Sequence, residues 1–358
     1  MAMGYPKKWK TGEFSRETPA PLKFGEDGKF KILHITDIHD VEPEMDDDED
    51  RSIPERKDIE TLNVIEKLLE KTDPDLVVFG GDNISGYWQE FTYNLVQSTI
   101  QKIIKPVKDR NIPLAVVFGN HDGEEGYHTE FQMMEYMEYA NCRSNLNDAD
   151  VYGCGNCCLT VKSSDGKKDA FAIWLMDSND YVRDSKGNRC YDYVHDDQIE
   201  WYENRAAQLK AANGGVPLPA ILFQHIPVQE ECIGMKEVGG DEEYTLERHG
   251  RYFYLGNEIL EGRVREEPSP PDMEQDHTAQ FKSWKKTGDI FAAFFGHDHV
   301  NDFKMNVDGI DLYQTLGAGY FTYGEERGGR LIVLDENNPR VLYTESIEIP
   351  QITDLVRE

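Results

Sequence analysis

Two kinds of apolar pattern alternate along the first half of the chain. Short continuous apolar runs predict buried strands: "FKILHIT" (30–36), "DLVVFGG" (75–81) and "PLAVVFGN" (113–120). Stretches with helical spacing follow these runs, at 56–72, 90–109 and 130–139. In the first of them, apolar residues recur three and four apart, at Ile59, Leu62, Ile65 and Leu69. Buried strands that alternate with amphipathic helices predict a parallel sheet covered on both faces.

The second half of the chain is more mixed. Four further apolar runs predict strands at 158–164, 170–178, 220–225 and 290–297, with a helix over 197–212. Alternating segments separated by Gly, Asp and Asn-Pro turns then predict an antiparallel tail at 302–316, 330–336 and 340–349.

No linker rich in Pro, Gly or Ser divides the chain into domains. We predict an N-terminal extension over 1–27, one α/β domain over 28–350, and a C-terminal tail over 351–358. The stretch 227–275 is rich in Gly, Glu and Pro, and we interpret it as a long loop or lid within that domain.

Composition narrows the classes of partner. The net charge is −30, from 68 acidic against 38 basic residues, which argues against a duplex nucleic acid partner. No apolar run reaches the ~18 residues that span a bilayer, so no membrane partner is expected. The N-terminal stretch lacks the apolar core of a signal peptide, so a cytoplasmic location is expected unless such a peptide has been removed. The sequence gives no indication of oligomeric state.

Six cysteines include the cluster "CGNCC" at 154–158. A structural zinc site needs a second well-spaced pair, and none follows. Buried thiols or a single disulfide are the favoured alternatives.

Polar residues follow five of the predicted strands directly. They are Asp37 and His39, then Asp82, then Asn120, His121 and Asp122, then His225, and finally His297 and His299. In parallel sheets, ligand-binding groups gather at the carboxyl ends of the strands. We therefore expect these side chains to meet at one edge of the sheet. Neighbouring glycines would let the backbone turn sharply there.

Each of these motifs has a structural alternative when taken singly. An aspartate after a strand is often a helix cap, "GNH" could form a turn, and His225 could be a hydrogen-bonded core histidine. Taken together they predict a dinuclear metal site, in which a carboxylate bridges two cations and neutral nitrogen and oxygen ligands complete each shell.

The ordered blocks D-x-H, G-D, G-N-H-D, H and G-H-x-H resemble the calcineurin-like metallophosphoesterases over residues 30–349. The resemblance implies a four-layer α/β/β/α sandwich of two mixed sheets, with metal ligands at the C-terminal ends of strands. It assigns Asp37, His39 and His299 to one metal ion and Asn120, His225 and His297 to a second, with Asp82 bridging. The implied ions are two divalent or trivalent transition metals, Mn, Fe or Zn.

Further blocks, such as "LMDSNDY", "GHDHVND" and "GAGYFTYG", look like the small purple-acid-phosphatase-like branch of that family. In purple enzymes a tyrosinate ligand stands three residues after the bridging aspartate, but this chain has Ser85 there. A ferric preference is therefore in doubt, and no tyrosinate–iron colour is expected. The block "GDNISG" also lacks the second acid and the arginine of protein Ser/Thr phosphatases.

The resemblance implies phosphate ester hydrolysis by a hydroxide that bridges the two metal ions, since paired cations lower the pKa of a bound water. His121, beside the ligand Asn120, is the expected general acid. Asp122 is expected either to orient His121 or to cap the following turn. Four residues are candidates for leaving-group contacts, each with a structural role as the alternative: Asn179, Tyr181, Tyr320 and Tyr323.

The favoured function is a phosphomonoesterase acting on a small phosphorylated metabolite or a phosphopeptide. The alternative enzyme is a phosphodiesterase of the cyclic-nucleotide or glycerophosphodiester kind, which can carry the same ligands. A non-catalytic metal-binding scaffold is a third hypothesis, but a scaffold would be expected to have lost some ligands or His121, and all are present.

Overall fold

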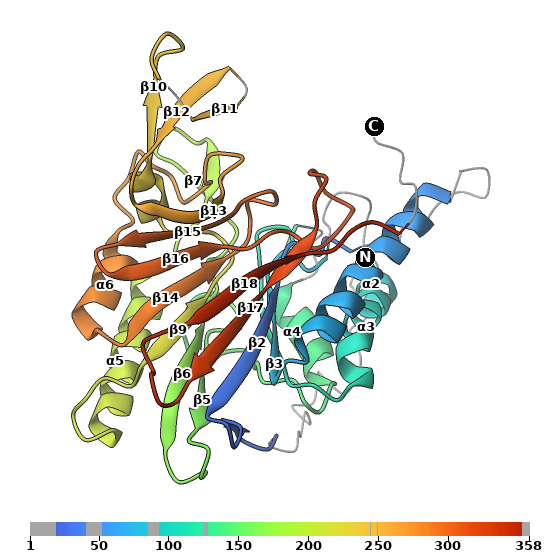
Figure 1. The fold of residues 1–358 in the computed structure, drawn as a ribbon, viewed down its shortest axis with the longest axis vertical. Helices are drawn as coiled ribbons and strands as arrows, with labels where there is room; N and C mark the ends of the chain where they lie inside the picture. Colours follow the sequence, from blue (N-terminus) through green and yellow to red (C-terminus); the bar gives the residue numbers. More distant parts are fainter. Residues whose placement is uncertain are drawn as a thin grey trace.

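The computed structural model describes residues 19–40, 52–84, 93–124, 128–243, 245–248 and 250–352. The acidic run 42–50 and Ser85 lie outside these residues. Two mixed β-sheets pack face to face, and helices cover the outer face of each sheet (Figure 1). The four-layer α/β/β/α sandwich implied by the family resemblance is therefore confirmed.

The five-stranded sheet has the order β18-β17-β2-β3-β4. Its parallel strands are β2 (Lys29–Ile35), β3 (Leu76–Gly80) and β4 (Leu114–Val117). β17 (Gly328–Asp335) runs antiparallel to β2, and β18 (Tyr343–Glu348) antiparallel to β17. Three helices lie on its outer face: α2 (Ser52–Thr72), α3 (Tyr93–Asp109) and α4 (Thr129–Met137).

The eight-stranded sheet has the order β1-β5-β6-β9-β14-β16-β15-β13. Its strands in chain order are β1 (Leu22–Lys23), β5 (Cys157–Lys162), β6 (Asp169–Leu175), β9 (Ala220–Phe223), β13 (Ile259–Arg263), β14 (Ile290–Phe295), β15 (Asp302–Val307) and β16 (Ile310–Gln314). The four strands β6, β9, β14 and β16 are parallel. Helices α5 (Asp196–Ala212) and α6 (Ala279–Thr287) cover the outer face.

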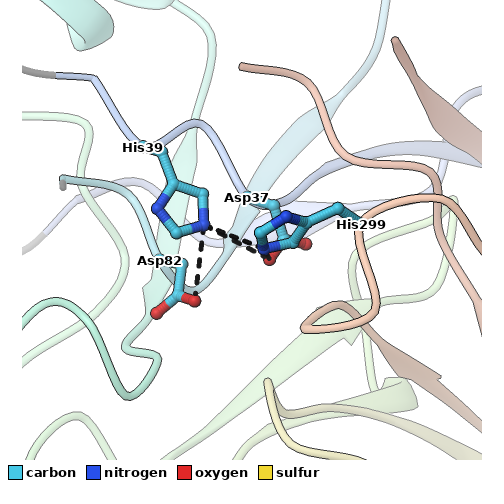
Figure 2. A group of neighbouring side chains, drawn as sticks. All are labelled: Asp37, His39, Asp82 and His299. Atoms are coloured by element: carbon cyan, nitrogen blue, oxygen red, sulfur yellow. Dashed lines mark hydrogen bonds and ion pairs between the residues drawn. The ribbon is translucent and has the colours of Figure 1, made fainter. Parts of the chain in front are cut away.

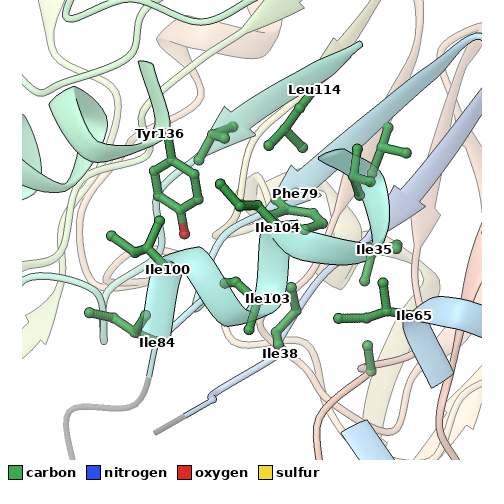
Figure 3. Close-up of a cluster of buried hydrophobic side chains, with 14 of the residues drawn as sticks. Ile35, Ile38, Ile65, Phe79, Ile84, Ile100, Ile103, Ile104, Leu114 and Tyr136 are labelled. Carbon is green, nitrogen blue, oxygen red and sulfur yellow. The ribbon is translucent and has the colours of Figure 1, made fainter. Parts of the chain in front are cut away.

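Three apolar layers hold the sandwich together, because side chains alternate between the two faces of each strand. On β2, Leu33 and Ile35 face the helices, whereas Ile32 faces the second sheet. On β3, Phe79 faces the helices and Val78 the second sheet. Figure 3 shows the helix-side layer, where the isoleucines of α3 pack over the aromatic ring of β3. The third layer lies between the eight-stranded sheet and α5 and α6.

The buried face of α2 differs from the predicted one. Ile65 and Leu69 are buried as expected, but Ile59 is 50% exposed. At that level of the helix the polar residues Glu60 and Thr61 are buried instead. They accept hydrogen bonds from the backbone N–H groups of Ile352 and Tyr320, at 3.0 Å and 3.1 Å. The first turns of α2 therefore contact C-terminal loops rather than the sheet.

The structure also differs from the predicted organisation at both ends of the domain. β1 lies within the predicted extension 1–27, yet it pairs with β5, and Leu22 and Phe24 are buried between the sheets. The predicted antiparallel tail forms two hairpins, of which β15–β16 belongs to the eight-stranded sheet and β17–β18 to the five-stranded one.

The segment 227–275, predicted as a long loop or lid, has regular structure. After a 3₁₀ turn (Gln229–Gly234) come β10 (Met235–Val238), β11 (Leu246–Arg248) and β12 (Arg251–Leu255), which form a three-stranded antiparallel sheet. We call residues 235–255 the projecting sheet, because it extends away from the sandwich (Figure 1). At its base, Gly256 N donates to Gly234 O at 2.8 Å. β13 then joins the edge of the eight-stranded sheet.

All six cysteines carry free thiols, and Cys142, Cys154 and Cys157 are buried. Of the two alternatives for the cysteines, buried thiols and a disulfide, the structure supports the thiols. Within the described part of the chain, no helix combines the length and the apolar character needed to cross a membrane.

Candidate dinuclear metal site

The polar residues predicted at five strand ends come together, but from two sheets rather than from one sheet edge. Asp37 and His39 follow β2, Asp82 follows β3, and Asn120 follows β4 of the five-stranded sheet. The remaining three follow strands of the eight-stranded sheet, His225 after β9 and His297 and His299 after β14. The site therefore lies where the carboxyl ends of the parallel strands in both sheets meet.

One group of potential ligand atoms comes from Asp37, His39, Asp82 and His299, all within 4.8 Å of one another (Figure 2). His39 Nε2 lies 3.5 Å from Asp82 Oδ2 and 3.0 Å from His299 Nε2. His299 Nε2 lies 3.4 Å from Asp37 Oδ1. Two carboxylates and two imidazoles thus converge in a buried space.

A second group comes from Asp82, His225 and His297, again with ligand atoms within 4.8 Å of one another. His225 Nε2 lies 3.0 Å from Asp82 Oδ2, although without hydrogen-bond geometry. Asp82 belongs to both groups, which is the arrangement a bridging carboxylate requires. Asn120 Nδ2 donates to the Tyr181 hydroxyl at 2.7 Å, whereas its Oδ1 is buried with no hydrogen-bond partner.

The residues present fit two metal ions. The buried candidate-ligand atoms without a hydrogen-bond partner include four: Asp82 Oδ2, Asn120 Oδ1, His225 Nε2 and His297 Nε2. Each such atom costs about 1–3 kcal/mol when left unpaired. Imidazole nitrogens and carboxylate or amide oxygens are ligands that suit first-row transition metals. Coordination would satisfy all four atoms at once.

The backbone of the site is strained at the candidate ligands themselves. Asp37, His39, Asp82 and His297 have φ values of 52°, 45°, 48° and 76°. This left-handed conformation costs roughly 1–2 kcal/mol for a residue with a side chain. Such strain persists only where surrounding structure enforces it, and it is common at functional sites. The packed strands hold these side chains in place.

The neighbouring glycines serve mainly to provide space, which differs from the predicted role in turning the chain. A Cβ atom at Gly119 would lie 2.3 Å from Asp82 Oδ1, and one at Gly296 would lie 2.7 Å from Asp37 Oδ2. Gly81 combines both roles, because its φ is 101° and a Cβ there would meet the His225 ring at 2.5 Å.

Burial and the adjacent carboxylates together set the protonation of the imidazoles. Burial lowers the pKa of His39 and of His297 to about 3, so both rings are neutral and their lone pairs are available. Burial alone would also lower the pKa of His225, but the adjacent Asp82 carboxylate raises it to about 10. Burial raises the pKa of Asp37 to about 7. Metal binding must therefore displace the proton on His225.

Two of the imidazoles are oriented by contacts to their second nitrogen. His299 Nδ1 lies 2.5 Å from Thr322 Oγ1, and His225 Nδ1 lies 3.0 Å from Gly80 O. Both contacts direct Nε2 toward the cluster. Partners of this kind fix the tautomer and ring orientation of a metal ligand. The sequence analysis did not predict this role for Thr322, because nothing in the loop "GYFTYG" marks the residue as a partner of His299.

His121 is close to the cluster, but its partner is not the predicted one. Its ring centroid lies 5.2 Å from that of His39. His121 Nδ1 lies 2.6 Å from Glu124 Oε2. The expectation that Asp122 orients His121 is corrected, because the Asp122 carboxylate accepts hydrogen bonds from the backbone N–H groups of Asn83, Ile84 and Gly119. Asp122 ties the loops after β3 and β4 together.

Two of the four substrate candidates are near the cluster. The Tyr181 hydroxyl accepts the hydrogen bond from Asn120 described above. The Tyr323 ring lies 4.3 Å from the His299 ring, and its hydroxyl donates to Glu266 Oε1 at 2.6 Å. Both residues border the candidate site.

The other two candidates have structural roles in the fold. Tyr320 is buried in the helix-side layer, with the Arg327 guanidinium 4.9 Å from its ring centroid. Asn179 Nδ2 donates to Tyr193 O at 2.7 Å and to Gln198 Oε1 at 3.1 Å, so its amide group fixes a loop. Leaving-group contacts from these two residues are not supported.

The sequence reasoning missed a hairpin beside the site, formed by β7 (Tyr181–Arg183) and β8 (Arg189–Tyr191). The Tyr191 ring lies 4.3 Å from the His297 ring, and Arg189 Nη2 lies 2.7 Å from Glu124 Oε1. The signal was available, since "YVRDSKGNRCY" places two short segments of strand-forming residues around a glycine-containing turn.

The fold and the buried Asp/His cluster together define a metallophosphoesterase-type architecture. The family model "Calcineurin-like phosphoesterase" matches residues 30–301, and the chain belongs to that family. The Arabidopsis thaliana protein named "Probable inactive purple acid phosphatase 14" is 27% identical over 341 residues, which cover 90% of this chain and 79% of the relative. "Phosphatase DCR2" of Saccharomyces cerevisiae is 27% identical over 297 residues, which cover 80% of this chain and 47% of the relative.

Among solved structures, a dimetal phosphatase from Danio rerio superposes with a TM-score of 0.52 at 12% sequence identity. The match covers 90% of this chain and 99% of that protein. At this identity the likeness bears on the fold alone.

Proposed function

We propose that the protein is a dinuclear metal-dependent phosphoesterase that hydrolyses phosphate monoesters, with a small phosphorylated metabolite or a phosphopeptide as substrate. The observation that carries the proposal is the position of Asp82, which is shared by two buried groups of candidate ligands. All seven candidate ligands are present, so the word "inactive" in the names of the Arabidopsis relatives has no counterpart in the ligand set of this chain.

When bound, two metal ions supply Lewis acidity that activates a water nucleophile and neutralises phosphoryl oxygens. In this proposal Asp37, His39 and His299 hold one ion, and Asn120, His225 and His297 hold the other. The remaining task for the chain is to protonate the leaving alkoxide. His121 is the group in reach of the cluster that performs this step as general acid.

The test is a comparison of His121→Ala with the unchanged protein on two monoesters. We expect metal content to stay the same and turnover to fall by ~10² to 10⁴ on an alkyl phosphate, which needs a proton on its leaving group. The loss on p-nitrophenyl phosphate should be smaller, because p-nitrophenolate leaves without protonation. His128→Ala, at an exposed histidine seven positions along the chain, is the matched control.

Equal losses on both monoesters would assign His121 to phosphate or metal binding instead. Faster cleavage of bis-p-nitrophenyl phosphate than of p-nitrophenyl phosphate would favour the diesterase alternative. Tight metal binding with no hydrolysis of any ester would show a scaffold.

A further inference from the structure

A carboxylate that faces His121 connects the candidate site to the β7–β8 hairpin. Glu124 Oε2 lies 2.6 Å from His121 Nδ1, and Glu124 Oε1 lies 2.7 Å from Arg189 Nη2. The Tyr181 hydroxyl, which accepts a hydrogen bond from Asn120, is close to Glu124. Glu124 therefore bonds to two residues, His121 at the candidate site and Arg189 on the hairpin.

The hairpin residue that contacts Glu124 is itself held in place. The Arg189 guanidinium lies 3.4 Å from the centroid of the Tyr181 ring, and the Tyr181 and Tyr191 rings stack at 5.6 Å. The Glu124 side chain is 19% exposed and that of His121 13%. A surface ion pair contributes little because both partners are mobile, but a half-buried carboxylate with a partner on each oxygen has a defined position.

We propose that Glu124 is the positioning residue for His121, and that Arg189 of the β7–β8 hairpin, which lies over the Tyr181 ring, holds Glu124 in place. The contact engages Nδ1 of His121 and so assigns Nε2 as the nitrogen that donates the proton to the leaving group. The proposal rests on the proposed function for its chemistry. Its structural part, the Nδ1–H···Glu124 hydrogen bond, stands independently of any activity.

The alternative is that Glu124 only anchors the hairpin to the sandwich. The two roles predict different kinetics. Loss of an anchor would disturb Tyr181 and its contact to the ligand Asn120, and so would change metal content and KM. Loss of a positioning residue would lower kcat through His121 alone, with metal content and KM retained.

The experiment compares Glu124→Ala and Glu124→Gln in the metal-loaded protein. We expect Glu124→Ala to lower kcat on an alkyl phosphate by ~10- to 10²-fold, a part of the ~10²–10⁴ that a general acid supplies. The loss on p-nitrophenyl phosphate should be smaller. Glu124→Gln keeps an oxygen acceptor for Nδ1–H and should restore part of the loss. Glu130→Ala, which removes an exposed acid of the same region, should leave kcat unchanged.

The double variant His121→Ala/Glu124→Ala gives the decisive comparison, because residues that act as a unit are not additive. It should be no slower than His121→Ala alone. A further loss in the double variant, or the same loss on both substrates, would overturn the positioning role.

Ring ¹⁵N NMR of the histidines in zinc-loaded protein tests the hydrogen bond without an assay. His121 should show a protonated Nδ1 in the unchanged protein, and this signal should shift or exchange rapidly in Glu124→Ala. An unprotonated Nδ1 in the unchanged protein would refute the proposal even if no ester were hydrolysed. An inactive protein with the expected signal would instead refute the proposed function and leave the contact standing.

Discussion

The candidate ligands and the residues that border them are built in opposite ways. The ligands follow buried strands of two sheets, and Asp37, His39, Asp82, Asn120 and His225 have no exposed surface. The bordering residues Tyr181, Arg189 and Tyr323 lie on a short hairpin and a loop and are at least partly exposed. In the proposed function, the packed sandwich would hold the metal ions, and selection of the ester would depend on segments that can change without disturbing the core.

The largest effect is expected from Asp82→Asn. An amide in this position cannot bridge two cations as a carboxylate does, so both ions should be lost from an otherwise folded chain. Elemental analysis should show the loss, and phosphatase activity should fall by at least ~10³-fold. Asp289→Asn is the matched control, because Asp289 is also buried but bonds to Trp174 and Tyr202, away from the cluster. Retention of both ions in Asp82→Asn would contradict the bridging role.

An intermediate effect is expected at Thr322. This residue lies in the same loop as Tyr323 and is partly exposed, but its hydroxyl contacts the buried candidate ligand His299. Thr322→Val keeps the shape and removes the hydroxyl next to His299 Nδ1, so the affinity for the first metal ion should fall by ~10- to 10²-fold. Titration against a chromophoric chelator measures this change without an assay of activity. Thr322→Ser keeps the hydroxyl and should bind metal as the unchanged protein does. Equal metal affinities in Thr322→Val and Thr322→Ser would show that the Thr322 hydroxyl does not contribute to metal binding.

The smallest effect on the metals is expected from removal of the projecting sheet. Gly234 O and Gly256 N are 2.8 Å apart, so a short Gly-Ser connector can replace residues 235–255. A wider excision, from Cys232 to Glu267, would also remove β13 from the eight-stranded sheet. Metal content and cleavage of p-nitrophenyl phosphate should stay unchanged, while the ranking of larger phosphate esters changes. An unchanged ranking of the larger esters would show that the projecting sheet has no part in selectivity. A role of this segment in selectivity stays a prediction.

The convergence of the candidate ligands was predictable because continuous apolar runs indicate buried strands. Runs such as 75–81 are continuously apolar, and the first polar residues after them, such as Asp82, mark where each strand leaves the core. Local pattern could not show that the strands belong to two sheets, since the pairing of β17 with β2 joins segments about 300 residues apart. Only the family resemblance supplied that part of the fold.

The bordering residues were harder to predict, because their roles depend on contacts between distant segments. Glu124 contacts Arg189 across 65 positions of the chain, and Thr322 contacts His299 across 23. Neither contact produces a periodic pattern of residues in the sequence from which it could have been predicted. Asp122 was misjudged for the opposite reason: it is adjacent to His121 in sequence, but its carboxylate is used by backbone N–H groups of the loops after β3 and β4.

The order of strands in the five-stranded sheet also bears on synthesis of the chain. β2 lies between β3 and β17, so one of its edges is covered only by a strand from residues 328–335. While the chain emerges from the ribosome, β2 can pair with β3 early, but its other edge stays open until nearly all of the domain has been made. An uncovered edge strand is a template for wrong pairing. Nascent chains that stall before residue 328 should therefore depend on chaperones more than those released complete.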